Sequence, residues 1–383
     1  MDSSFLSSLL DFLLSGLGLG AIYALIALGY SMVYGILKLI NFAHGEFFML
    51  GAYAGYFVLS RSGIERLALP HPLPILLSFL AALAAASLSA ATLAVVTERI
   101  AYRPLRRAGR TAPLITAVCA SLILQNLAIK AWSATPRAYP EPRQWAALAQ
   151  LSMPLADDWR VVRAPGPVMT QLATTQVVTT RTDDEWDHEL RAGATLDAET
   201  LERLRADGHD VVYRTVALGE GVKRGLVVLA LVLSAPALWL LVMRTRMGRA
   251  MRAISEDSDA ARLMGIDVDR VVSWTFFVGA LVAGVGGVAY CVVAGKVDPL
   301  VGFLPGLKAF VAAVVGGIGS IPGAVLGGLV LGVTESVVPF LIQRITGWPD
   351  AFAWKDAMAL VLMIAVLLFR PAGLLGRPQR ERV

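Results

Sequence analysis

Apolar runs of about twenty residues recur along the whole chain, and a helix of that length spans the hydrocarbon core of a bilayer. Lipid offers the backbone no hydrogen bonds, so each run must form a helix or be buried among helices. The composition agrees, with 56% hydrophobic and only 16% charged residues and a mean hydropathy of +0.64. We therefore predict an all-α polytopic membrane protein.

Seven candidate spans follow from these runs. They are 5–28, 44–60, 73–96, 112–132, 224–243, 271–293 and 357–369. A further apolar segment, 308–341, is too long for one span and is interrupted by "GGIGSIPG", which predicts a tight turn between a half-helix and a full helix. Residues 29–43 add a possible half-span. The prediction is about 8–10 transmembrane helices, including a Gly/Pro-interrupted hairpin, with a small soluble α+β insert.

The insert is marked by its composition. Residues 133–222 hold nine Arg, no Lys and fourteen acidic residues, a net charge of −5, whereas the remaining chain carries +10. "VMTQLATTQVVTT" is rich in Thr and Val, as strands are, and "LDAETLERLRADGHDVVYR" reads as a helix followed by a strand. We expect an N-terminal transmembrane half (1–132), an extracytoplasmic acidic insert (133–222) and a C-terminal transmembrane half (223–383).

Lys and Arg in short loops predict the orientation. Five Arg lie in 98–110, six in 243–270 and four in the tail from Arg370. These segments are expected to be cytoplasmic. The N-terminus and the insert are then outside, and the C-terminus is cytoplasmic, in a multi-pass protein of the bacterial inner membrane. The positive charge in these loops orients the chain on lipid and does not indicate nucleic-acid binding.

A polar cluster interrupts the apolar N-terminal region in "ILKLINFAHGEFFMLG" (36–51). In one interpretation Asn41, His44 and Glu46 cap and begin the next helix in an ordinary loop. In the other, they line a translocation path, because polar groups inside a membrane are costly and tend to be functional. Both interpretations stay open from the residues alone.

A second polar group lies in the span 112–132. Gln125 and Asn126, with Thr116 and Ser121, form a polar column that predicts either interhelical hydrogen bonds or a path lining. Lys308, at the start of the hairpin segment, is expected at the membrane interface.

The loop 244–270 is expected to contact a partner. A short helix is predicted over Glu256–Met264, with Ser255 as N-cap and Gly265 as terminator. A short amphipathic helix between two spans suits a groove on another protein. The alternative is a helix on the lipid surface, which its acidic residues disfavour at a negative membrane face.

Several functions are excluded or disfavoured. The chain has no GxxxxGK[ST] motif, so it should hydrolyse no nucleotide itself. The spans hold almost no acidic residues and no Ser-His or paired-carboxylate arrangement, and neither the four His nor the two Cys form a metal-ligand pattern. We expect no enzyme activity, no metal and no cofactor bound by this chain.

Four stretches together resemble one family. They are "GLGLGAIYALIALGYSMVYGILKLINFAHGEFFMLGAY" (16–53), "MGRAMRAISEDSDAARLMGIDVDRV", "LKAFVAAVVGGIGSIPGAVLGGLVLGVTE" and "FRPAGLLG". In this order they are similar to the signatures of the branched-chain amino acid ABC transporter permeases, the inner-membrane permease subunits with the NFAHG signature. The acidic insert is a departure, because the resemblance leads us to expect a shorter external loop.

The resemblance implies a permease subunit of an ATP-binding cassette importer for branched-chain or related amino acids, amides or urea. It implies four kinds of partner: a second permease subunit, homologous or identical, two ATPase subunits that bind ATP, an extracytoplasmic solute-binding protein, and membrane lipid. By motif, Asn41, Ala43, His44, Gly45 and Glu46 belong to the NFAHG signature. The candidates for the substrate path are Asn41, His44, Glu46, Gln125 and Asn126. The residues of the ATPase-contacting loop are Glu256, Asp257, Ala260, Ala261 and Gly265.

Two other functions fit the residues less well. An ion-coupled secondary transporter needs a titratable residue near mid-membrane, and His44 and Glu46 are the candidates. A receptor-like module would use the insert 133–222 for sensing.

Overall fold

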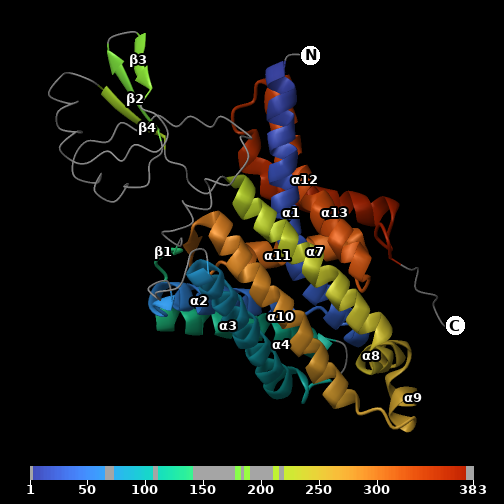
Figure 1. Cartoon of the computed structure of the whole chain (residues 1–383). Helices are drawn as coiled ribbons and strands as arrows, with labels where there is room; N and C mark the ends of the chain where they lie inside the picture. Colours follow the sequence, from blue (N-terminus) through green and yellow to red (C-terminus); the bar gives the residue numbers. More distant parts are fainter. Residues whose placement is uncertain are drawn as a thin grey trace. The chain divides into compact units, whose positions relative to one another are not determined.

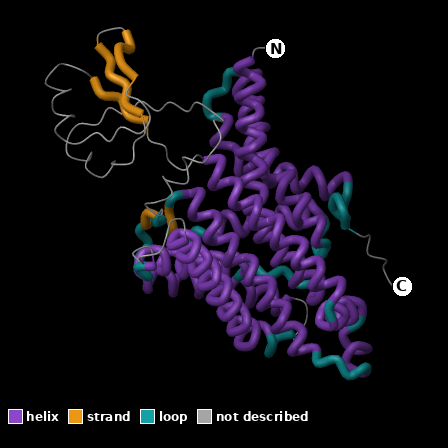
Figure 2. Tube along the Cα trace, viewed as in Figure 1, coloured by secondary structure: helices purple, strands orange, loops and turns teal. Residues whose placement is uncertain are grey.

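A computed structural model describes residues 3–64, 73–106, 111–140, 177–182, 185–189, 210–214 and 220–376. It divides into two compact units, 1–141 with 223–383, and 142–222. The first unit is helical, apart from one small pair of strands (Figures 1 and 2). The described part of the second contains strands. The domain boundaries drawn from composition stay predictions.

Seven described helical segments are long and apolar enough to cross a membrane, which confirms the all-α polytopic fold class. They lie in α1 (Ser3–Leu37), α3 (Leu73–Thr97) with the π-helical turn η2 (Glu98–Tyr102), α4 (Thr111–Trp132), α7 (Glu220–Arg244), α10 (Val268–Ala294), α12 (Ile321–Thr346), and η4 (Ala351–Trp354) with α13 (Lys355–Phe369). Two further helices, α2 (His44–Arg61) and the shorter apolar α11 (Phe303–Gly316), pack with them. α2 contains the predicted span 44–60 but is not among the seven.

The first helix is longer than predicted. The span 5–28 and the half-span 29–43 are one helix, α1, which ends only at Leu37. The sequence predicted 29–43 as a possible separate half-span, yet no Pro occurs in 16–37, and tertiary packing supports a continuous helix through its Gly and Ala residues. At about 52 Å, α1 exceeds the thickness of the hydrocarbon core. It stops where Lys38 adopts a positive φ of 54°.

Small residues set the helix packing. α1 packs mainly against α12, and α10 packs against α1, α2 and α3. A Cβ atom placed on Gly332 of α12 would lie 2.2 Å from the backbone nitrogen of Gly20, and one on Gly284 of α10 would lie 2.4 Å from the carbonyl oxygen of Ala86. Glycine is therefore required at these crossings, where the helix backbones meet directly.

The predicted hairpin is confirmed. α11 ends at Gly316, and α12 begins at Ile321. Gly317 and Gly319 have φ values of 105° and 90°, which favour glycine. The Ser320 hydroxyl then caps α12 by accepting a hydrogen bond from the backbone N–H of Gly323 at 3.2 Å. The turn is thus dictated by local sequence.

The second unit contains a three-stranded antiparallel sheet in the order β3-β2-β4, made of Val177–Thr182 (β2), Glu185–Glu189 (β3) and Asp210–Arg214 (β4). The strand predicted in "DVVYR" is β4. The helix predicted in "LDAETLERLRADG" lies outside the described residues. A separate two-stranded pair, Arg137–Ala138 (β1) with Lys296–Val297 (β5), belongs to the first unit.

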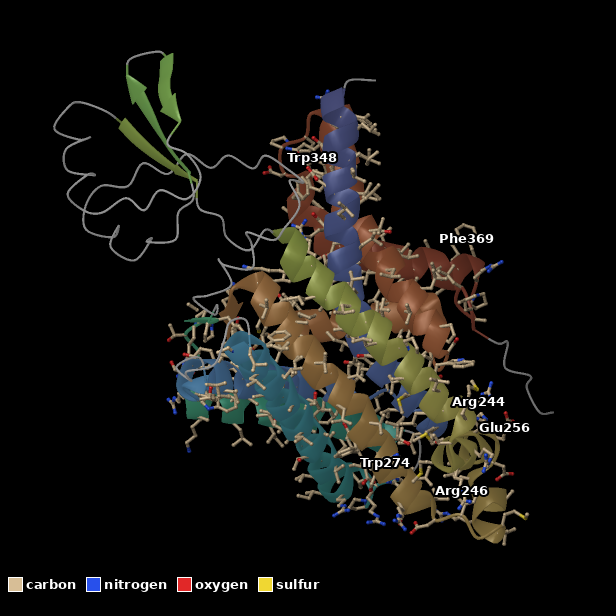
Figure 3. The ribbon with its side chains drawn as sticks, in the orientation of Figure 1. Arg244, Arg246, Glu256, Trp274, Trp348 and Phe369 are labelled. Carbon is tan, nitrogen blue, oxygen red and sulfur yellow. The ribbon has the colours of Figure 1, made fainter. Side chains whose placement is uncertain are left out.

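Arg244 and Arg246 mark one end of the first unit (Figure 3). Figure 3 shows Arg244, Arg246 and Glu256 together at one end, with Trp348 at the other. This basic end also carries α8 (Arg246–Glu256) and α9 (Ser258–Leu263), which lie at the lower right of Figure 1.

Candidate functional site

The loop that joins α1 to α2 is held by Asn41. Its side chain is buried, and its Oδ1 accepts a hydrogen bond from the Tyr102 hydroxyl at 2.5 Å. Its backbone carbonyl accepts from the N–H of His44 at 3.0 Å. The expected side-chain cap is absent at this described helix start, since Ala43 occupies the N-cap position. Asn41 therefore ties the loop to η2.

Glu46 joins α2 to α4. Its side chain is buried in the first turn of α2, where the helix dipole favours a carboxylate. Its Oε1 accepts hydrogen bonds from Gln125 Nε2 at 2.8 Å and from Ser121 Oγ at 3.0 Å. Gln125 thus makes an interhelical hydrogen bond, one of the two interpretations of the polar column.

His44 lies against α1. Its ring centroid is 4.8 Å from that of Tyr30, and a Cβ atom on Gly29 would lie 2.1 Å from its Nε2. Among the described residues, His44 Nε2, Asn41 Nδ2 and Glu46 Oε2 are buried without a hydrogen-bond partner. Unpaired buried polar atoms are costly, so each has capacity to bind water or solute. Their role in the path stays a prediction.

Asn126 lies on a different face of α4 from Gln125. Its side chain is exposed and donates to the carbonyl of Leu122 at 2.8 Å within its own helix. It lies in a shallow, mostly apolar groove with Leu122, Ile123, Leu127 and Lys130. Gln125 and Asn126 are therefore not brought to one site.

Sequence reasoning missed a buried ionic cluster. Lys308 of α11 was expected at the interface, yet its ammonium pairs with Glu335 of α12 and lies 2.6 Å from Asp356 Oδ1 of α13. The Tyr23 hydroxyl of α1 donates to Glu335 Oε2 at 2.8 Å. The expectation that Lys308 lies at the membrane interface is therefore wrong, because its ammonium is held among the helices by the few acidic residues of these segments. In the sequence, the cluster is visible only as single charged residues in three apolar segments. Because these residues are far apart in the chain, their pairing could not be predicted.

The loop 244–270 forms two helices where one was predicted. Glu256 is the last residue of α8, and Asp257, in place of Ser255, is the N-cap of α9. The Asp257 Oδ1 accepts from the N–H groups of Asp259 and Ala260 at 2.9 and 3.0 Å. Because the Asp257 carboxylate binds both of these backbone N–H groups, a new helix begins after it.

The tip of α9 is apolar and exposed. Leu263 is 89% exposed and Met264 is 83% exposed, whereas Ala261 is buried against its own chain. Ala260 is exposed on the same helix. Gly265 ends the helix with a φ of 82°, as predicted. An exposed apolar tip beside charged groups is typical of a protein contact.

An ionic network lies beside α9. Arg106 pairs with the buried Glu98 of η2, and its Nη1 lies 2.7 Å from Asp269 of α10. Arg103 lies 2.7 Å from the same carboxylate. Ser273 donates to Glu98 at 2.5 Å. The network links the start of α10, just after α9, to η2, which carries Tyr102, the partner of Asn41.

Span-length helices with buried ionic groups and an exposed helix tip at a basic end define a polytopic membrane protein of the transport class. The chain belongs to the family described as "Branched-chain amino acid transport system / permease component", which matches residues 12–367. The resemblance carried by the signature stretches is thereby confirmed.

Curated relatives agree along nearly the whole chain. The high-affinity branched-chain amino acid transport system permease protein BraD of Pseudomonas aeruginosa is 35% identical over an alignment that covers 97% of each chain. The permease protein LivH of Escherichia coli, of the same description, is 34% identical with 96% of each chain covered. These relatives are transport permeases. No solved structure matches the chain.

Proposed function

We propose that the chain is the membrane permease of an ATP-binding cassette importer for branched-chain or related amino acids in the bacterial inner membrane. The proposal carries the function named for the relatives over to this chain. Its basic end faces the cytoplasm, because positively charged short loops stay on that side. The N-terminus and the insert are then outside.

One observation carries the mechanism: the exposed apolar tip of α9, held between the spans α7 and α10. A tip of this kind suits a groove on a partner. We assign that partner to two ATPase subunits, which bind the ATP that this chain has no motif to bind. A second permease subunit completes the path, and a solute-binding protein delivers substrate outside.

The ionic network offers a route for the movement. A push on α9 reaches Asp269 at the start of α10, then Arg106 and Glu98, and so η2. Tyr102, the last residue of η2, bonds to Asn41 in the loop before α2. The half-exposed Asp269 is thus connected to the buried Glu98 by a contiguous set of ion pairs and hydrogen bonds, the kind of network that can carry coupling between sites.

The test uses Leu263→Glu with Met264→Glu. Both side chains are exposed, so the fold should persist while the partner contact is lost. We expect ATP-driven leucine uptake and copurification of the ATPases to fall at least about tenfold, the scale on which a charge in an apolar contact acts. Leu300→Glu, another exposed leucine, is the matched control. Asp257→Arg is a poorer probe because it also removes the cap of α9.

Uptake that persists without any ATPase would overturn the proposal and leave an ion-coupled transporter in its place. Unchanged ATPase association in the double variant would refute the role of the α9 tip.

A further inference from the structure

The outward face of α4 is exposed along most of its length. α4 packs mainly against α2 and η2. On the opposite side, Ile115, Cys119, Leu122 and Asn126 are all exposed. Residues three and four positions apart lie on one face of a helix, so these four side chains form one continuous strip. We call them the α4 strip.

The spacing of the α4 strip is that of a seam between two helices. Ile115 and Leu122 are seven residues apart, as are Cys119 and Asn126, and the two pairs alternate along the helix. This is the a and d pattern of helices that cross at about 20°, a common geometry in membrane bundles. A single asparagine at an a position specifies how such helices pair. The α4 strip therefore has the pattern of a pairing surface.

Asn126 lies inside the span. Along the helix axis it is about 22 Å from Thr111, the first residue of α4, and about 9 Å from Trp132, the last. Lys130 lies one turn nearer the end of α4, where a long side chain reaches the headgroups. Within the hydrocarbon depth, the polar group of the α4 strip is thus the Asn126 amide.

The Asn126 amide has an unused acceptor. Its Nδ2 donates to the carbonyl of Leu122 at 2.8 Å, and no residue in the described part of the chain donates to its Oδ1. The amide lies in the shallow groove that runs along α4 beside Leu122 and Ile123. Lipid tails supply no hydrogen-bond donor, whereas a neighbouring helix can supply one. The oxygen is therefore better matched by protein than by lipid.

Two other outer helices show what a lipid-facing surface of this chain looks like. The exposed residues of α7 between 226 and 240, and those of α13 between 360 and 369, are apolar or aromatic throughout. Polar groups that face lipid are costly, and these two faces contain none. The α4 strip differs from them by its amide, which indicates a protein neighbour.

We propose that the second permease subunit packs on the α4 strip through its equivalent helix, with the Asn126 amide hydrogen-bonded across the seam. This inference rests on the proposed function, which includes a second permease, and adds the surface that binds it. Two permeases related by a two-fold axis along the membrane normal present equivalent helices in parallel and at the same depth. An amide both donates and accepts, so it is complementary to an amide or hydroxyl at the same level.

The first experiment identifies the neighbour by photo-cross-linking in membranes that hold the complete transporter. Leu122→p-benzoylphenylalanine should give a product with the combined mass of two permease subunits. The matched control is Leu233→p-benzoylphenylalanine, because Leu233 of α7 is also exposed, at 64% against 53% for Leu122. The product from position 122 should be at least about tenfold more abundant, since only a packed helix stays within reach of the probe. Adducts with lipid alone at both positions would overturn the proposal.

The second experiment measures pairing without transport. The purified permease subunits carry two fluorophores, and energy transfer is followed as the vesicles are diluted with lipid. Asn126→Leu should lower the association constant about three- to tenfold, the range that one interhelical hydrogen bond in a membrane contributes. Asn126→Gln retains the amide and should stay within about twofold of the parent.

An exchange variant serves as the sharpest control. Asn126→Leu combined with Leu127→Asn keeps the composition but turns the amide by about 100° off the α4 strip. It should pair as weakly as Asn126→Leu alone, while thermal unfolding of the single subunit stays unchanged in every variant. Parental pairing in the exchange variant would overturn the proposal, because the position of the amide would then be irrelevant.

The two proposals fail differently. If the parent transporter takes up leucine with ATP but position 122 reacts only with lipid, the pairing surface is wrong and the proposed function stands. If the parent shows no ATP-dependent uptake while position 122 still cross-links to a second permease subunit, the proposed function fails and the pairing surface stands.

Discussion

Two neighbouring amides show how strongly the role of a residue depends on its direction. Gln125 and Asn126 follow one another in α4, yet Gln125 bonds to Glu46 of α2 and Asn126 bonds within its own helix. Successive residues of a helix point about 100° apart, so only one of the two faces the bundle. A carboxamide side chain therefore has a structural role on one face of α4 and is exposed on another.

This difference predicts that the two side chains contribute unequally to the free energy of unfolding. Gln125→Ala should lower stability by about 1–3 kcal/mol, because the buried Glu46 carboxylate loses one of its two donors. Asn126→Ala, the matched control, should stay within about 0.5 kcal/mol of the parent, as exposed substitutions usually do. Thermal unfolding of the detergent-purified protein measures both. Equal destabilisation by the two variants would contradict the structure.

At the scale of elements, glycine contacts decide how α1 and α12 cross. Gly16 and Gly20 of α1 meet Gly328 and Gly332 of α12 at backbone distance. Small residues four apart are a known means of close helix approach in membranes. α7 offers a contrast, since Gly225 has open space around its Cα.

Gly332→Ala should therefore be destabilising by at least about 1–3 kcal/mol, because its Cβ meets backbone that cannot yield. Gly225→Ala is the control, also in a helix, and should be neutral or slightly stabilising. The yield of folded monomer after heating reports both. Tolerance of Gly332→Ala would mean that the helices are further apart than described.

At the scale of the whole molecule, residues 142–222 form a compact unit of their own, whereas the insert predicted from composition begins at 133. Tyr139 donates its N–H to Gly295 and its hydroxyl to Ala52, and β1 pairs with β5. Residues 137–139 therefore belong to the first unit. The first acidic residue of the insert is Glu141, so the acidic excess begins only after these residues.

Replacing residues 142–219 with a Gly/Ser linker should leave the membrane unit inserted and folded, because the span helices make their packing contacts without the second unit. A shortening from 137 should instead destabilise it by removing the β1–β5 pairing. Membrane fractionation and limited proteolysis separate the two cases. Loss of insertion in the 142–219 variant would show that the insert supports the bundle.

The sequence by itself determined several features that depend on local physics. Runs of apolar residues specified the spans, positive-φ glycines at 317, 319 and 265 specified the turns, and signature stretches specified the family. The tertiary structure alone decided which polar groups meet. Tyr23 and Glu335 are 312 positions apart in the chain. A single charged residue in an apolar segment does not indicate which distant residue it will contact. Folding brings such groups together because a buried charge is stable only when another helix supplies its counterpart.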